Sequence, residues 1–269
     1  MIGPRIATGT LLIVFIVGSI LYLPEVVVQC AFVLALFLAA REWGQFFDSP
    51  SATLVWAYAL ITVFLALALS EIVAGWVDNK SILLVGVLWW LGALIWLLHY
   101  QFRHIPSPPG TAGVALIGWF VFLPAWFAIF QLLRADGALL LLLFMIVWSA
   151  DTAAYFVGRE VGKHPLAPRI SPGKTWEGVI GGVLGAALLV GGFCWWSGGF
   201  ADQLPLLVLL IVLTTMASIL GDLLESLLKR HRGLKDSGAV LPGHGGVLDR
   251  LDSTFAAAPV FALGYLAIS

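Results

Sequence analysis

Charged residues are scarce in this 269-residue sequence. They make up 11% of the chain, whereas hydrophobic residues make up 61%, and soluble domains contain about 25% charged residues. The net charge is only −1, which excludes the broadly basic surface of a nucleic-acid-binding protein. The two cysteines lie in apolar runs and indicate neither a disulfide framework nor a metal site. No internal repeat, low-complexity tract or separate soluble domain is evident, so the lipid bilayer is the main solvent of this chain.

Long apolar runs are abundant instead. A helix needs about 20 apolar residues to cross the hydrocarbon core of a bilayer. We therefore predict an all-α, polytopic integral membrane protein with about nine transmembrane helices, the range being eight to ten. The first run lacks an A-x-A-like cleavage site, so it is predicted to be a membrane span and not a signal peptide. The predicted spans are Ile6–Leu23, Val26–Ala40, Leu54–Leu69, Ile82–Leu98, Ala112–Leu133, Ala138–Val157, Gly178–Trp196, Pro205–Leu228 and Val247–Ile268.

The distribution of basic residues predicts the orientation, because Lys and Arg in short loops are retained on the cytoplasmic side. With a cytoplasmic N-terminus, all of the 14 Lys and Arg residues except Lys80 and Arg134 lie on that side. The two longest polar loops, 158–177 and 229–246, then share the cytoplasmic face. We accordingly divide the chain into N-terminal transmembrane helices, 1–136, and a C-terminal part, 137–269, whose helices and cytoplasmic loops carry the catalytic site.

Several carboxylates stand in or beside the last two predicted spans. A charge at the centre of a membrane helix costs about 2.5 kcal/mol or more, so each carboxylate there needs a partner or a function. Asp222, Ser226 and Lys229 follow one another at helical spacing, and Asp249 and Asp252 stand one turn apart. A structural ion pair would explain any one such pair. The clustering of so many favours a functional site.

The loop between these spans combines glycines with bases. Gly245 and Gly246 would let backbone N–H groups approach an anion closely, and Lys235 and Arg250 would supply positive charge. Carboxylates beside phosphate-binding bases make electrostatic sense chiefly when a hard cation such as Mg²⁺ bridges them.

The last two spans and the loop between them contain the pattern Ser226-x-x-Lys229-Arg230-x-x-x-x-Lys235-Asp236-x-Gly238-x-x-Leu241-Pro242-x-His244-Gly245-Gly246-x-x-Asp249-Arg250-x-Asp252. This pattern resembles the signature of the phosphatidate cytidylyltransferases, also called CDP-diacylglycerol synthases. A second block is similar to the same family, namely Ser149-Ala150-Asp151-Thr152-x-Ala154-Tyr155-x-x-Gly158-Arg159 followed by Ser171-Pro172-x-Lys174-Thr175-Trp176-Glu177-Gly178. The resemblance covers about the last 120 residues, and the N-terminal spans agree only in hydropathy.

The resemblance implies transfer of a cytidylyl group from CTP to phosphatidic acid, which gives CDP-diacylglycerol and pyrophosphate. It implies Mg²⁺ as the cofactor, leaves a second cation and a homodimer open, and places the enzyme in the inner (plasma) membrane with its site facing the cytoplasm. Asp222 and Asp249 are the expected metal ligands. The expected catalytic residues are Asp222, Asp249, Asp252, Lys229 and His244, and the expected substrate-binding residues are Ser171, Lys174, Thr175, Ser226, Arg230, Lys235, Asp236, Gly245, Gly246 and Arg250.

Other interpretations of these residues stay open at this point. His244 could instead cap the last helix, Glu177 could be a capping acid, and Asp151 could make a structural hydrogen bond. The glycines at 178, 181, 182 and 185 predict close helix packing or a subunit interface, and Trp43 is interpreted as an interfacial anchor. The alternative functions are a transporter, a CTP-dependent lipid or polyprenol kinase, and an alcohol phosphatidyltransferase, although the chain lacks the dense acidic segment of the last.

Overall fold

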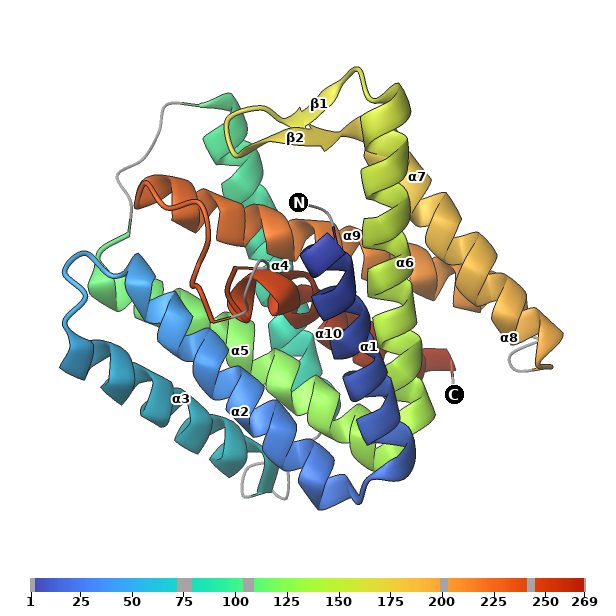
Figure 1. The fold of residues 1–269 in the computed structure, drawn as a ribbon, viewed down its shortest axis with the longest axis horizontal. Helices are drawn as coiled ribbons and strands as arrows, with labels where there is room; N and C mark the ends of the chain where they lie inside the picture. Colours follow the sequence, from blue (N-terminus) through green and yellow to red (C-terminus); the bar gives the residue numbers. More distant parts are fainter. Residues whose placement is uncertain (1–2, 72–78, 104–108, 199–202, 241–244, 269) are drawn as a thin grey trace.

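The computed structural model describes residues 3–71, 79–103, 109–198, 203–240 and 245–268. In these ranges the chain forms a helical bundle with one small β-hairpin (Figure 1). The prediction of an all-α polytopic protein is therefore confirmed. The elements are α1 (Gly3–Tyr22), α2 (Glu25–Trp43), η1 (Gly44–Phe46), α3 (Ala52–Glu71), α4 (Asn79–Phe102), α5 (Thr111–Ala135), α6 (Gly137–Val161), β1 (Pro165–Ala167), β2 (Ser171–Thr175), α7 (Trp176–Ala186), the π-helical η3 (Ala187–Gly191), α8 (Gly192–Trp196), α9 (Leu204–His231) and α10 (Leu248–Ile268).

Eight helical segments in the described part of the chain are long and apolar enough to cross a membrane. They correspond to the second to ninth predicted spans. The segments α7, η3 and α8 together form one of these spans, Trp176–Trp196. The helix α1 overlaps the first predicted span, and its described side chains include the shorter apolar segment Ile13–Tyr22.

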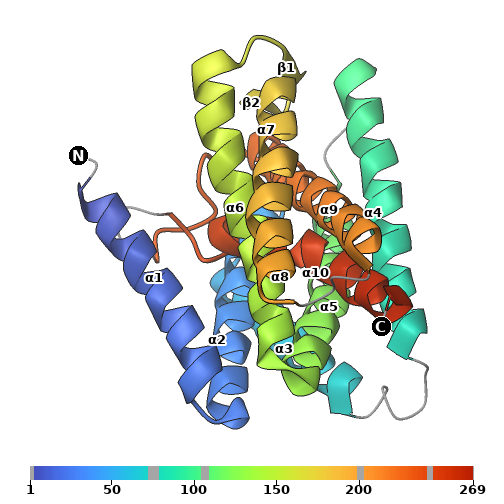
Figure 2. The same ribbon diagram turned by 90° about the vertical axis from the view of Figure 1, so that its right-hand side faces the viewer.

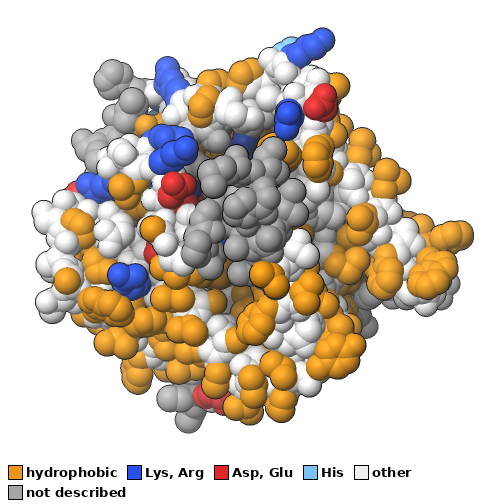
Figure 3. Space-filling model, viewed as in Figure 1, with side chains coloured by type: hydrophobic (Ala, Val, Ile, Leu, Met, Phe, Trp, Pro, Cys, Tyr) orange, Lys and Arg blue, Asp and Glu red, His pale blue; other side chains and the backbone are white. Residues whose placement is uncertain are grey.

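The outer surface of the bundle is apolar. Large hydrophobic side chains such as Phe64 (70% exposed), Leu188 (76%) and Trp196 (80%) point away from the protein interior. Figure 3 shows hydrophobic side chains over the lower half of one face, whereas Lys and Arg gather over its upper part. Such a surface requires an apolar solvent over most of its height, which supports a multi-pass membrane protein.

Helices α9 and α10 pack closely against each other where the predicted site residues lie. A Cβ atom at Gly221 on α9 would overlap the backbone oxygen of Asp252 on α10 and approach the Cβ of Ala256 to 2.9 Å. Glycine at this position therefore permits the close approach of the two helices. As a result, the carboxylates of Asp222 and Asp252 are carried on adjacent faces of the helix pair.

The glycine-rich stripe of α7 packs within the chain. A Cβ at Gly182 would lie 2.9 Å from the backbone oxygen of Ala150 on α6, and one at Gly185 would overlap the Cβ of Ala153. The two helices run side by side in both ribbon views (Figure 2). The stripe thus serves the packing of α6 on α7, which was one of its two predicted roles.

Trp43 departs from its predicted role. Its side chain is only 2% exposed, and its Nε1–H donates to the backbone oxygen of Val114 at 2.9 Å. The interpretation as an interfacial anchor was wrong. Tryptophan is common both at membrane interfaces and in helix-packing cores, and its position along the sequence did not distinguish the two.

One end of the bundle is held by Arg232, at the end of α9. Its Nε–H donates to the backbone oxygen of Phe46 at 2.7 Å, and its Nη2 pairs with Asp48 at 2.6 Å. At the other end Arg134, on α5, pairs with Glu25 and Glu71 at 3.5 and 3.7 Å. The C-terminal end of α9 therefore meets the segment that follows α2. The N-terminal end of α10 meets the last turn of α2 through the hydrogen bond from the N–H of Leu248 to Glu42.

Candidate active site

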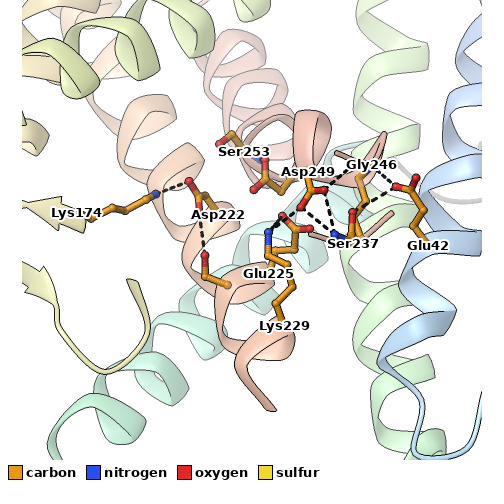
Figure 4. Close-up of polar contacts among 12 residues, drawn as sticks. Glu42, Lys174, Asp222, Glu225, Lys229, Ser237, Gly246, Asp249 and Ser253 are labelled. Atoms are coloured by element: carbon orange, nitrogen blue, oxygen red, sulfur yellow. Dashed lines mark hydrogen bonds and ion pairs between the residues drawn. The ribbon is translucent and has the colours of Figure 1, made fainter. Parts of the chain in front are cut away.

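Acidic and basic side chains from four elements converge where α9, α10, α2 and the β-hairpin meet (Figure 4). They form two groups, one around Asp222 and one around Asp249.

The first group joins the hairpin to α9. Lys174 lies near the C-terminal end of strand β2, and its Nζ lies 2.7 Å from Oδ2 of Asp222. The other oxygen of Asp222 accepts a hydrogen bond from Ser226 Oγ, one helical turn further on, at 3.1 Å. Lys174 and Asp222 are 25% and 34% exposed, so this pair is open to solvent at one side. All three residues were predicted site residues, and the structure brings them together.

The second group lies deeper, between α9 and α10. Lys229 Nζ lies 2.7 Å from Oδ1 of Asp249 and 3.4 Å from Oε2 of Glu225. The side chains of Lys229, Asp249 and Glu225 are 13%, 7% and 2% exposed. A buried charge is tolerated only when it is paired, and here one ammonium group serves two carboxylates.

Asp249 also holds the loop that precedes α10. The backbone N–H of Ser237 donates to both of its oxygens, at 3.0 and 3.2 Å, and the N–H of Gly246 donates to Oδ2 at 2.8 Å. Asp249 stands in the first turn of α10, where a negative charge interacts favourably with the helix dipole. Gly245 has a φ of +81°, a conformation that favours glycine, and a Cβ there would lie 2.8 Å from Asp249 Oδ2.

Asp252 connects the two groups. It interacts with Asp222 on one side and with Glu225 on the other, and it accepts a hydrogen bond from the backbone N–H of Ser253 at 2.7 Å. Glu225 and Asp252 together line a small cavity of about 10 Å³, which Trp43 and Trp90 help to close. Asp151 faces the same carboxylates from α6. The structure therefore gathers carboxylates from both motif blocks around two lysines.

The residues predicted on the hairpin have identifiable structural contacts. Thr175 is the N-cap of α7, because its Oγ1 accepts a hydrogen bond from the N–H of Gly178 at 3.1 Å. Glu177 accepts hydrogen bonds from the N–H groups of Lys163 and His164 at 3.2 Å, and it lies 2.6 Å from His164 Nδ1. Glu177, in the first turn of α7, thus ties that helix to the segment that precedes β1. Ser171 is the first residue of β2, and substrate binding by Ser171 and Thr175 stays a prediction.

The remaining predicted residues surround the two groups. Arg230, Lys235, Asp236 and Arg250 are exposed, and substrate binding by these residues stays a prediction. Gly246 is buried, and its N–H, expected to face a phosphate, donates to Asp249 in this structure. His244 lies outside the described residues.

Glu42, on the last turn of α2, is an acid to which the sequence alone gave no role. Its carboxylate is 3% exposed and contacts the loop that joins α9 to α10. Glu225 likewise received no assigned role in the sequence, although it stands in the acidic face of α9. The one signal for Glu42 was a carboxylate next to Arg41 at the end of an apolar run, which is equally typical of an interfacial residue.

The chain was compared with known families and proteins. Residues 4–268 match the model of the cytidylyltransferase family. A phosphatidate cytidylyltransferase of Pseudomonas aeruginosa is 38% identical over 97% of this chain and 96% of its own length. One of Staphylococcus haemolyticus is 38% identical over 73% of the chain and 72% of its own length. One of Haemophilus influenzae is 51% identical over 47% of the chain and 45% of its own length.

Proposed function

Since the chain belongs to the cytidylyltransferase family, we propose that it is a phosphatidate cytidylyltransferase of phospholipid biosynthesis. An oxygen of the phosphate group of phosphatidic acid attacks the α-phosphorus of CTP, CDP-diacylglycerol forms, and pyrophosphate leaves. The observation that carries this proposal is similarity over 97% of the chain to a relative named for that activity. The cluster of acids and bases that contains the signature residues supports it.

The chemistry requires no nucleophile from the protein, because the lipid phosphate is itself the nucleophile. Catalysis then consists of holding two phosphates in line and neutralising their charge. Lys174 and Lys229 contribute positive charge inside the site, and the exposed Arg230, Lys235 and Arg250 bind phosphates of CTP or of the lipid at its mouth. Burial of Lys229 strengthens its interaction with any anion that enters.

A divalent cation fits the donor set of this site. The available ligands are carboxylate oxygens, which Mg²⁺ prefers, and the structure gathers the carboxylates of Asp222, Asp249 and Asp252 at the junction of α9 and α10. No group of three or more His, Cys, Asp or Glu side chains in the described ranges has the geometry of a complete metal site. This agrees with Mg²⁺ sites that use one or two carboxylates and complete their shell with substrate phosphates.

Asp222 and Asp249 would hold the cation, with Asp252 between them as a third carboxylate or as a partner of the ligands. When bound, the cation would neutralise charge on the phosphate oxygens during the transfer. Whether a second cation binds stays open.

We further propose that the protein lies in the inner membrane with this site at the cytoplasmic face, where CTP is available. The uneven distribution of Lys and Arg supports this orientation. The position of Arg134 also supports this orientation. Arg134 is predicted to lie on the outer side, and it pairs with Glu25 at the end of α2 that is far from the site.

A product assay with two differently labelled forms of CTP tests the function. The purified protein is incubated with Mg²⁺, with phosphatidic acid together with the lipid alcohols diacylglycerol and a polyprenol, and with CTP labelled with ³²P at either the α or the γ position. We expect α-label, and no γ-label, in a lipid product that migrates as CDP-diacylglycerol. Lipid labelled only from the γ position would show a kinase, and no labelled lipid from either form would refute both enzymatic readings and favour a transporter.

A further inference from the structure

One side chain from the N-terminal half of the chain enters the candidate active site. Glu42 lies on the last turn of α2 and is 3% exposed. A buried carboxylate is costly unless it accepts hydrogen bonds or has a charged partner. Its contacts therefore indicate what the residue does.

Glu42 accepts its hydrogen bonds from the loop that carries the family signature. Its Oε2 accepts from the backbone N–H of Leu248 at 2.7 Å and from Ser237 Oγ at 3.3 Å. Leu248 is the first residue of α10, so the carboxylate lies at the positive end of that helix. The second oxygen, Oε1, is buried and has no hydrogen-bond partner among the described residues.

Two glycines of the signature loop make this contact possible. A Cβ atom at Gly238 or at Gly246 would overlap the carboxylate of Glu42. The loop therefore closes around the Glu42 carboxylate, and any larger residue at either position would displace it. The requirement for glycine at these two positions comes from Glu42, and at Gly246 from Ser237 Oγ as well.

The groups that contact Glu42 are also those that hold Asp249 (Figure 4). Ser237 donates its Oγ–H to Glu42 and its backbone N–H to Asp249 at 3.0 Å. Gly246 packs on Glu42 and donates its N–H to Asp249 at 2.8 Å. Displacement of Glu42 would therefore shift both backbone donors of Asp249, and with them the pairing of Asp249 with Lys229.

We propose that Glu42 is a positioning residue of the active site. It fixes the described parts of the loop, 235–240 and 245–247, through Ser237 and the first turn of α10, and thereby holds Asp249 in the orientation that the reaction requires. It contacts no reacting atom. This inference rests on the proposed function, because Asp249 is assigned its role there.

The test compares the same chemical change at the two ends of one helix. Glu42→Gln keeps the size of the side chain and removes its charge, whereas Glu25→Gln makes that change at the far end of α2, where the side chain is 47% exposed and paired with Arg134. Changes in residues that orient catalytic or metal-binding groups typically reduce activity by about 10- to 100-fold. We expect Glu42→Gln to lower kcat within this range, with the KM values for CTP and phosphatidic acid within about twofold of the parent. Glu25→Gln should leave kcat unchanged.

Ser237→Ala provides a second route to the same contact, because it removes the Oγ donor and leaves the backbone N–H that binds Asp249. Its kcat should fall, and the double variant should lose less than the product of the two single losses. If Glu42→Gln fails to fold, the kcat of Ser237→Ala alone tests whether the contact between Glu42 and Ser237 supports catalysis. Melting temperatures in detergent identify variants whose loss is only structural.

A folded Glu42→Gln or Ser237→Ala protein with parental kcat would overturn the inference. A loss confined to yield or melting temperature, with parental kcat in the folded fraction, would overturn it as well. If the parent chain and Glu25→Gln make no CDP-diacylglycerol, it is the proposed function that has failed.

Discussion

Replacement of Asp249 by asparagine separates a catalytic role of the acidic cluster from a purely structural ion-pair role. The carboxylate accepts from Lys229, Ser237 and Gly246 and is 7% exposed. Asparagine keeps the size of the side chain but offers one acceptor oxygen in place of two, and it carries no charge. The change therefore removes the charge and one accepting position.

The expected loss of stability follows from these contacts. One buried backbone N–H loses its acceptor, which costs about 1–3 kcal/mol. Breaking a buried ion pair costs about 3–5 kcal/mol, but Lys229 keeps the Glu225 carboxylate at 3.4 Å. We therefore expect a total destabilisation of about 2–4 kcal/mol. This would lower the melting temperature of the protein and leave it inserted in the membrane.

The Asp249→Asn change should also reduce activity. If Asp249 holds a divalent cation, the variant loses a ligand charge and several kcal/mol of transition-state stabilisation. A loss of about 3 kcal/mol corresponds to about 100-fold in rate. Asp222→Asn should show a comparable loss, since Asp222 is the second proposed ligand. Both variants should need more Mg²⁺ for half-maximal activity.

The assay is CDP-diacylglycerol formation against Mg²⁺ concentration, with melting temperature measured in detergent. Asp48→Asn is the matched control, because Asp48 pairs with Arg232 at 2.6 Å and accepts from the N–H of Thr111 at 3.0 Å outside the acidic cluster. Its side chain is 49% exposed, so it should lose about 1 kcal/mol or less and keep its turnover. Near-parental turnover in a folded Asp249→Asn protein, with parental cation dependence, would refute the metal-ligand assignment.

Three further predictions concern the hairpin, the loop and the orientation. Lys174→Ala should raise the KM for CTP or phosphatidic acid more than it lowers kcat, and unchanged KM values for both would remove Lys174 from the binding site. Gly245→Ala should cost about 1–2 kcal/mol through its left-handed backbone and also reduce activity by displacing Asp249, whereas Gly233→Ala, with a φ of +67° and open space around it, should cost only the stability. In a chain without its native cysteines, Val240→Cys should react with a membrane-impermeant maleimide only after the cytoplasmic face is opened and Lys80→Cys from outside, and the reverse pattern would contradict the orientation.

The membrane spans could be predicted from the sequence because the signal is local. Each of the eight candidate spans is a continuous apolar segment, and the length of this apolar run distinguishes it from a helix of a soluble protein. The pairing of Lys229 with Glu225 also follows from helical spacing within α9. The β-hairpin was not predicted, since Ser171–Thr175 contains proline and glycine and no alternation of apolar and polar residues.

The contacts between the two halves of the chain could not be predicted in this way. Glu42 and Ser237 are 195 positions apart, and Glu42 and Leu248 are 206 apart. A single carboxylate at the end of an apolar helix has the same sequence pattern whether it faces the headgroups or a partner helix. Only the packing of α10 against α2 distinguishes these two environments. The C-terminal motifs therefore indicated where the site is, and not which N-terminal residue supports it.

Lys174 and Lys229 pair with carboxylates of the site and are also proposed to bind phosphates. In this structure Lys174 pairs with Asp222, and Lys229 pairs with both Asp249 and Glu225, yet the proposed reaction also needs positive charge on phosphates. A divalent cation beside the aspartates would take over their neutralisation, and the ammonium groups would then be available to CTP and lipid. Removal of either lysine therefore has two effects, because it withdraws a phosphate contact and takes the ammonium partner from Asp222, in the case of Lys174, or from Asp249 and Glu225, in the case of Lys229. The second effect should be weaker at Asp222, which is 34% exposed, than at Asp249, which is 7% exposed. Lys174 is consequently the lysine at which substrate binding can be measured with the least change in stability.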